Sequence, residues 1–331
     1  PGSSSYTDYD LAITAAATDW IAARRNAERP WATFVSLVSP HFPLRAPQEF
    51  SNLYADADFD LEPQQLPDHP EIRNLARFFD YEQHFTDETR HAAIAGYFGL
   101  TSFLDDCVGE ILATLEESGQ TEDTVILYLS DHGELLGDKG MWTKQVMYEA
   151  SAGIPMILAG PGVPDGIVRN TAASIVDVAA TALDVMLDTA DDSAPGLSLR
   201  QLAQDPDDAD RTVLCEYHDG GSTTGAFMVR WGDWKYVCYP GMPPQLFNLA
   251  EDPSEDHDLG SDVSQRAAAA RAEGASRLAA ICDADAVNRQ CFADQAARIE
   301  ALGGIDVCRN AHLFNHTPTP AEQAAMREDG R

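Results

Sequence analysis

The chain has few positive charges. Its 331 residues contain 22 Lys and Arg against 54 Asp and Glu, so the formal net charge is -32 at pH 7. A field of this sign repels nucleic acids and anionic membranes, which argues against both as partners. One explanation of the excess is an acidic, solvated surface, as in a salt-tolerant protein. The other is an electrostatic preference for cationic substrates.

The chain also lacks paired cysteines with the CxxC spacing of a metal site. Its six cysteines are Cys107, Cys215, Cys238, Cys282, Cys291 and Cys308. Scattered cysteines in a long chain indicate free thiols, so we expect a reducing, cytoplasmic compartment, although a Cys282–Cys291 or Cys291–Cys308 disulfide stays open. No apolar run has membrane length, and no signal peptide is recognisable. Because the opening PGSSSYTDYD looks like mid-chain sequence, a periplasmic or secreted location stays open too.

The hydrophobic pattern of the sequence alternates between that of strands and that of helices. Unbroken apolar runs of strand length predict strands buried on both faces at 31–39, 123–131 and 153–163. Helical patterns occupy 8–23, the residues after a Thr86 cap, and 174–187 with Ser174 as its cap. This alternation predicts an α/β domain with a mostly parallel sheet flanked by helices.

The pattern changes near residue 205, within an acidic linker. Short strands joined by turns follow, with a hairpin expected at Trp231-Gly232-Asp233, and then two helices at about 261–282 and 286–303. We therefore expect two domains. Residues 1–205 would form the α/β domain, and residues 206–331 a small antiparallel α+β subdomain.

The stretch LSDHGELLGDKGMWTK (129–144) carries the strongest chemical signal. Asp131 and His132 end a predicted strand of a parallel sheet, the edge at which such sheets bind ligands. Successive strand residues point to opposite faces, so the two side chains converge on one metal ion only if the chain bends at Gly133. Alone, the pattern is equally typical of a strand-end turn capped by Asp131. By ligand chemistry, one carboxylate and one imidazole suit Mn²⁺ or Zn²⁺ better than Ca²⁺.

Two further residues extend this candidate site. His41 follows the predicted strand 31–39, and Lys144 follows a glycine-bounded turn beside Trp142. Taken singly, His41 fits a loop histidine with a structural hydrogen bond, and Lys144 fits a surface lysine packed on Trp142. Together with a metal, an imidazole and an ammonium on one rim would form a receptor for a tetrahedral anion.

At this point the sequence resembles the sulfatases of the alkaline-phosphatase superfamily, and within them the choline-sulfatase-like branch. The resemblance extends over nearly the whole chain. It depends on SPHFPLRAP (39–47), YFGLTSFLDDCVGEIL (97–112), LSDHGELLGDKGMWTK (129–144), GIPMILAGPG (153–162), MVRWGDWKYV (228–237) and QLFNLAEDPSEDHDL (245–259), which occur in family order.

The resemblance implies hydrolysis of a small sulfate ester. It implies Asp131 and His132 as metal ligands, and His41 and Lys144 as catalytic residues that contact the sulfate. The metal in sulfatases is usually Ca²⁺, which we therefore expect, whereas related phosphonate monoester hydrolases use Mn²⁺. A homo-oligomer is compatible with the sequence.

Two features of the family do not occur in this sequence. Family members begin with a strand that bears paired aspartates. They then carry a Cys- or Ser-x-Pro-x-Arg motif, whose Cys or Ser becomes the formylglycine nucleophile. We therefore expect the chain to correspond to the C-terminal part of such an enzyme and to be inactive alone. A phosphonate monoester or phosphodiester hydrolase, or a non-catalytic fragment, are the alternatives.

The stretch CEYHDGGS (215–222) bears on the substrate. Glu216, Tyr217 and His218 stand where the choline-sulfatase-like branch has a similar stretch, and aromatic faces with carboxylates suit a quaternary ammonium group. We expect these three residues to bind substrate, choline sulfate being one candidate. Core packing of Tyr217 within the small subdomain is the alternative.

Overall fold

The computed structural model describes residues 2–187 and 195–310. The chain divides into two compact units. The first unit consists of Pro1–Pro63, His84–Leu127 and Leu158–Val163, and the second of Gln64–Gln83, Tyr128–Ile157 and Pro164–Arg331. The boundary expected at residue 205 stays a prediction.

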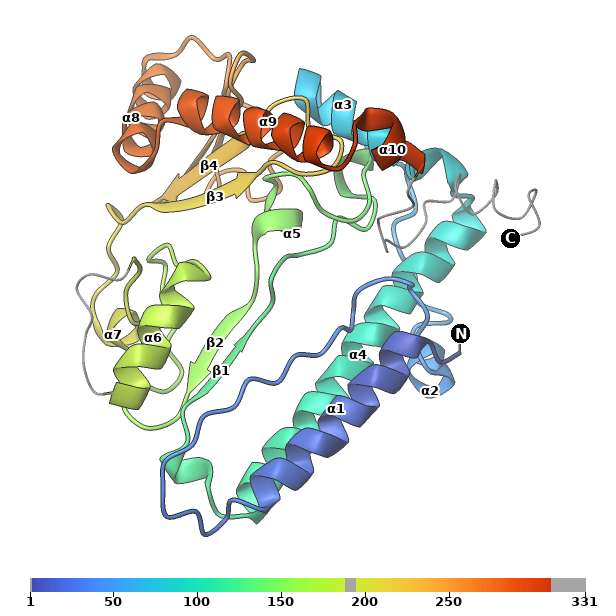
Figure 1. Cartoon of the computed structure of the whole chain (residues 1–331), viewed down its shortest axis with the longest axis vertical. Helices are drawn as coiled ribbons and strands as arrows, with labels where there is room; N and C mark the ends of the chain where they lie inside the picture. Colours follow the sequence, from blue (N-terminus) through green and yellow to red (C-terminus); the bar gives the residue numbers. More distant parts are fainter. Residues whose placement is uncertain (1, 188–194, 311–331) are drawn as a thin grey trace. The chain divides into compact units, whose positions relative to one another are not determined.

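Two long helices dominate the first unit. Helix α1 (Ser5–Ala22) lies along α4 (Asp87–Glu117), and the short α2 (Gln48–Asn52) packs on α4 as well (Figure 1). Both long helices begin at capping boxes, formed by Ser4 with Thr7 and by Thr86 with Thr89, which satisfy the free amides of the first turn. The two helices predicted here are confirmed.

The strand expected at 31–39 is wrong. The segment forms no strand, and Phe34 is 87% exposed. The buried Asp10 of α1 instead accepts hydrogen bonds from the amides of Val38 (2.7 Å) and Ser39 (2.8 Å). An apolar run becomes a strand only where a neighbouring strand forms hydrogen bonds with its backbone. Here the side chain of Asp10, not a strand, accepts the hydrogen bonds of these two amides.

The C-terminal part of the second unit contains a four-stranded antiparallel sheet, as predicted. Its order is β3 (Val213–Tyr217), β4 (Ala226–Trp231), β5 (Trp234–Cys238), β6 (Gln245–Asn248). Trp231 pairs with Trp234, which confirms the hairpin, and Gly232 occupies the turn with a φ of 45°.

Helix α8 (Gln265–Ile281) packs on this sheet, and α9 (Ala284–Ala301) and α10 (Ile305–Asn310) follow it (Figure 1). The core beneath α8 contains buried residues of both elements: Phe227, Val229, Trp231, Tyr236, Leu246, Ala267, Ala270 and Leu278. A Cβ on Gly274 would lie 2.6 Å from Tyr236, so only glycine allows α8 to approach this closely.

The other strands, β1 (Ile126–Leu129) and β2 (Met156–Ala159), form a two-stranded sheet. Both are shorter and more exposed than predicted: every residue of β1 is only half-buried, and Ile157 of β2 is 59% exposed. The second unit also contains α3 (Pro70–Phe79), α5 (Glu149–Ala152), α6 (Val176–Leu187) and α7 (Leu199–Gln204). Helix α6 begins two residues after the expected cap, Ser174.

The α/β class with a small C-terminal antiparallel sheet is confirmed. All six cysteines are free, so neither of the disulfides left open forms. Within residues 2–187 and 195–310, no helix is long and apolar enough to cross a membrane.

Candidate functional site

Asp131 and His132 lie just beyond the end of β1, where the chain bends. The amide of Gly133 donates to the carbonyl of Ser151 (2.8 Å), and a Cβ at this position would lie 2.1 Å from the carbonyl oxygen of Ala150. Glycine is therefore required for the bend. Oδ2 of Asp131 lies 3.6 Å from Nε2 of His132, so the two side chains converge instead of pointing to opposite faces.

Lys144 joins this pair. Its Nζ lies 2.8 Å from Nε2 of His132, while Nδ1 of His132 lies 2.8 Å from the carbonyl oxygen of Gly133. A carbonyl oxygen only accepts, so Nδ1 carries the hydrogen, and the lone pair of Nε2 accepts from the ammonium of Lys144. Burial lowers the pKa of Lys144, and the carboxylates of Asp131 and Glu134 oppose that shift.

The backbone on either side of Lys144 is strained. Thr143 has a φ of 70° and Gln145 a φ of 92°, values rare for residues with a side chain. The carboxylate of Glu134 accepts from the amide of Thr143 (2.5 Å) and from that of Leu136 (3.2 Å), and it thereby helps to hold this conformation. Burial raises the pKa of Glu134, and these two hydrogen bonds oppose the increase.

Glu134 was not predicted as a site residue from the sequence. Its letter is visible in SDHGE, two residues after the candidate ligand His132. No sequence signal identifies the Thr143 amide as its partner. The two residues are nine positions apart in an irregular segment, where contacts do not follow the periodicity of a helix or a strand.

A buried ion cluster anchors the chain just after Lys144. The fully buried Lys235 donates to the carbonyl of Met147 (2.8 Å) and pairs with Glu149 (2.6 Å) and Glu255 (2.7 Å). Glu255 also accepts from the amide of Glu149 (2.6 Å). This cluster was not predicted from the sequence either, since its members come from three separate parts of the chain.

His41 belongs to the first unit and has contacts of its own. Its Nδ1 lies 2.7 Å from the carbonyl oxygen of Phe42, so by the same argument Nδ1 carries the hydrogen in the neutral ring. Asp10, which binds the amides of Val38 and Ser39, holds the segment that leads to His41. This role of Asp10 was not predicted from the sequence.

Glu216, Tyr217 and His218 follow one another at the end of β3. Glu216 is exposed, and its Oε2 lies 3.9 Å from Nε2 of His218. Tyr217 donates to the carbonyl of Gly220 (3.0 Å) and packs against two buried clusters, and burial raises its pKa. His218 packs edge-on against Phe227, with ring centroids 4.9 Å apart. Their substrate-binding role stays a prediction.

Asp131 and His132 fit two positions of a metal site. Two ligands at about 2.0–2.6 Å from one cation lie roughly 3–4 Å apart, and their separation of 3.6 Å agrees with that. Among the described residues, no group of three or more His, Cys, Asp or Glu side chains could hold a metal ion. The role of Asp131 and His132 as metal ligands stays a prediction.

Comparison with known proteins gives the family. The sulfatase model matches residues 2–189, and the model for the C-terminal part of N-sulphoglucosamine sulphohydrolase matches residues 137–278. Choline-sulfatase of Rhizobium meliloti (strain 1021) is 34% identical over 245 residues, which are 72% of this chain and 48% of that protein.

Two solved structures share the fold. The phosphonate monoester hydrolase of Silicibacter pomeroyi superposes with a TM-score of 0.63 at 26% identity, over 78% of this chain and 58% of that one. A 2-O GAG sulfatase superposes with a TM-score of 0.62 at 20% identity, over 96% of this chain and 71% of that one. These neighbours agree with the expected alkaline-phosphatase-like class.

The chain spans about half the length of the curated relatives it matches. The sulfatase model nevertheless matches more than half of the 331 residues, and its match includes the bend that carries Asp131, His132 and Lys144. The chain belongs to the sulfatase family.

Proposed function

We propose that the intact protein hydrolyses sulfate esters, with Lys144 and His132 in its anion-binding centre. One observation carries the proposal: Nζ of Lys144 lies 2.8 Å from Nε2 of His132, beside the carboxylate of Asp131. An ammonium held by strained backbone next to two metal-type donors suits a site where negative charge increases in the transition state.

Asp131 and His132 would hold a divalent metal, Ca²⁺ by family analogy and Mn²⁺ as the alternative. When bound, this ion would stabilise charge on the sulfuryl oxygens as a Lewis acid. The hydrogen on Nδ1 of His132 leaves Nε2 as the donor atom toward the ion, which would replace the Lys144 ammonium at that lone pair, and the Gly133 carbonyl holds the ring in that orientation. The remaining ligands would come from residues outside this sequence.

Lys144 would contact a sulfate oxygen and offset the charge that develops there. His41, with a hydrogen on Nδ1 bound to the Phe42 carbonyl, would donate a proton from Nε2 of its imidazolium form to the departing alcohol. The nucleophile would be a formylglycine outside this sequence, which would supply the oxygen that attacks sulfur.

For the substrate, the similarity to choline-sulfatase supports choline sulfate or another small alkyl or aryl sulfate. A phosphonate monoester hydrolase is the second candidate, because a solved enzyme of that type is 26% identical to this chain. Parallel assays of the intact protein on choline sulfate, an aryl sulfate and an aryl phosphonate monoester distinguish the two. Higher kcat/KM on the sulfates supports our proposal, and higher kcat/KM on the phosphonate would replace it.

A further inference from the structure

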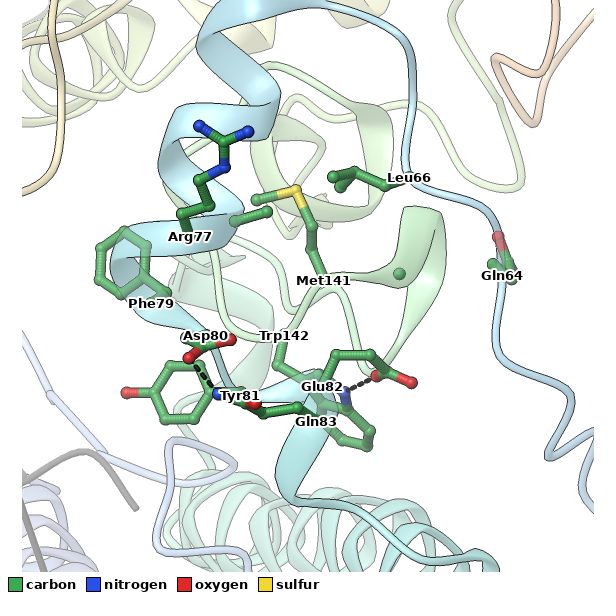
Figure 2. A pocket seen from close by; sticks show the side chains of 12 residues that line it. Gln64, Leu66, Arg77, Phe79, Asp80, Tyr81, Glu82, Gln83, Met141 and Trp142 are labelled. Atoms are coloured by element: carbon green, nitrogen blue, oxygen red, sulfur yellow. Dashed lines mark hydrogen bonds between the residues drawn. The ribbon is translucent and has the colours of Figure 1, made fainter. Parts of the chain in front are cut away.

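A hollow of about 400 Å³ lies within the second unit, between the end of α3 and the segment that precedes Lys144. Figure 2 shows the side chains that line it. Its volume lies in the range of sites for small molecules. The residues assigned to the sulfate-binding centre do not line it.

Aromatic rings and carboxylates gather at one end of this hollow. Phe79 and Tyr81 have nearly parallel rings, 11° apart, with centroids separated by 6.4 Å. Glu82 accepts a hydrogen bond from Nε1 of Trp142 (2.7 Å), which fixes a carboxylate beside the indole. Asp80 ends α3 in the left-handed conformation, with a φ of 46°, and is exposed.

The opposite end of the hollow is apolar. Leu66 and Met141 supply an apolar wall, and Figure 2 shows the guanidinium of Arg77 directed away from Tyr81 and Glu82. The positive charge therefore does not occupy the acidic end. The net charge of -32 for the whole chain adds a long-range attraction for cations.

We propose that this hollow, the Trp142 pocket, binds an organic cation of the alkylammonium class. Faces of aromatic rings attract such cations, and carboxylates at the same end strengthen the attraction, whereas methyl or methylene groups fit the apolar wall. A strongly hydrated inorganic cation gains little from apolar and aromatic walls, so the organic class is favoured. The pocket is independent of the proposed hydrolysis, because it shares no residue with Asp131, His132, Lys144 or His41.

Calorimetric titration tests the pocket on the intact protein without any turnover. The probes are tetramethylammonium, choline and 3,3-dimethyl-1-butanol, which has the shape of choline without the charge. Asp80→Asn removes one charge and tolerates the left-handed backbone, since Asn adopts it readily. Tyr81→Leu removes one ring. Glu300→Gln is the matched control, because Glu300 is exposed on α9 and does not line the pocket.

We expect choline to bind at least ~10-fold more tightly than its neutral isostere, the factor that a cation–π contribution of ~1.4 kcal/mol produces. Asp80→Asn and Tyr81→Leu should each weaken choline binding by about 3- to 10-fold, and Glu300→Gln should leave it unchanged. Equal binding of the neutral isostere, or wild-type affinity in both pocket variants, would overturn the proposal. So would the absence of choline binding to a folded protein, as checked by circular dichroism.

Discussion

The ammonium of Lys144 lies 2.8 Å from Nε2 of His132, although the two residues are twelve positions apart in the chain. The bend at Gly133 turns His132 out of the direction of β1, and the strained residues Thr143 and Gln145 aim Lys144 at it. A backbone in such sparsely populated conformations persists only where its surroundings hold it, and it is common at functional sites.

Replacement of Lys144 by Ala should lower kcat/KM for a sulfate ester by about two to three orders of magnitude, as the loss of one charge-stabilising contact typically does. The fold should survive, because Lys144 is only partly buried. Steady-state kinetics of the intact protein measure the effect. Arg289→Ala, which removes an exposed positive charge on α9, is the control. Near-normal turnover of the Lys144 variant would show that the anion receptor is misassigned.

Replacement of Asp131 by Asn should weaken the retention of a divalent metal, because the ion loses a charged ligand. The measurement is metal content by mass spectrometry after dialysis, beside that of wild type and of Glu300→Gln. The carboxylate of Asp131 is 83% exposed, so the fold should tolerate the change. Metal content equal to that of wild type would remove Asp131 from the metal site.

Glu134→Ala should reduce both stability and turnover. It leaves the amides of Thr143 and Leu136 without their acceptor, at a cost of about 1–3 kcal/mol each where they are buried. It also releases the strained turn that aims Lys144, and a displacement of ~1 Å costs roughly 100-fold in rate.

Glu134→Gln separates the two effects of Glu134, because Gln retains an oxygen acceptor and loses the charge. We expect it to restore most of the stability and much of kcat, as measured by thermal unfolding and steady-state kinetics. If the Ala and Gln variants behave alike in both measurements, the charge of Glu134 matters and its hydrogen bonds do not.

Acid should weaken one contact between α6 and α7. Hydrogen bonds from Arg200 and Ser198 lower the pKa of Asp184, and Arg200 binds both carboxylate oxygens, at 2.6 and 3.0 Å. The folded-state pKa is below the unfolded value, so this contribution is complete above an unfolded pKa of about 3.9 and is lost as the pH falls through the folded value.

Thermal unfolding of wild type and Asp184→Asn between pH 7 and pH 3 provides the measurement. The difference between the two proteins should be largest at neutral pH and should shrink below about pH 4. Comparison with the variant removes the common effect of the other carboxylates. A difference that is constant with pH would show that the ionisation of Asp184 does not contribute.

The 331 residues by themselves should show no turnover of an aryl sulfate or of choline sulfate, even with metal added. Nucleophilic catalysis needs an activated group within reach of the sulfur, and no cysteine of this sequence has the x-Pro-x-Arg context. Hydrolysis well above the metal-only background would place the nucleophile within this chain.

Local signals in the sequence predicted much of the fold. The Thr86 cap, the hairpin around Gly232 and the antiparallel strands depend on neighbouring residues, and the structure contains them all. The Ser4 cap of α1 was not predicted. The run at 31–39 was misjudged because pairing is not local. Its apolar letters suit a buried strand, but Asp10 takes up two of its amides.

In the candidate site, too, some features follow from the local sequence and others only from the tertiary structure. The sequence by itself determined the residue types: Asp131, His132 and Lys144 stand in an order and spacing typical of sulfatases, and Gly133 allows the bend. Only the tertiary structure decided that Lys144 meets Nε2 of His132 and that Glu134 holds the strained turn between them. Residue types and glycine-dependent bends are encoded locally, whereas contacts across an irregular segment depend on how the whole unit packs.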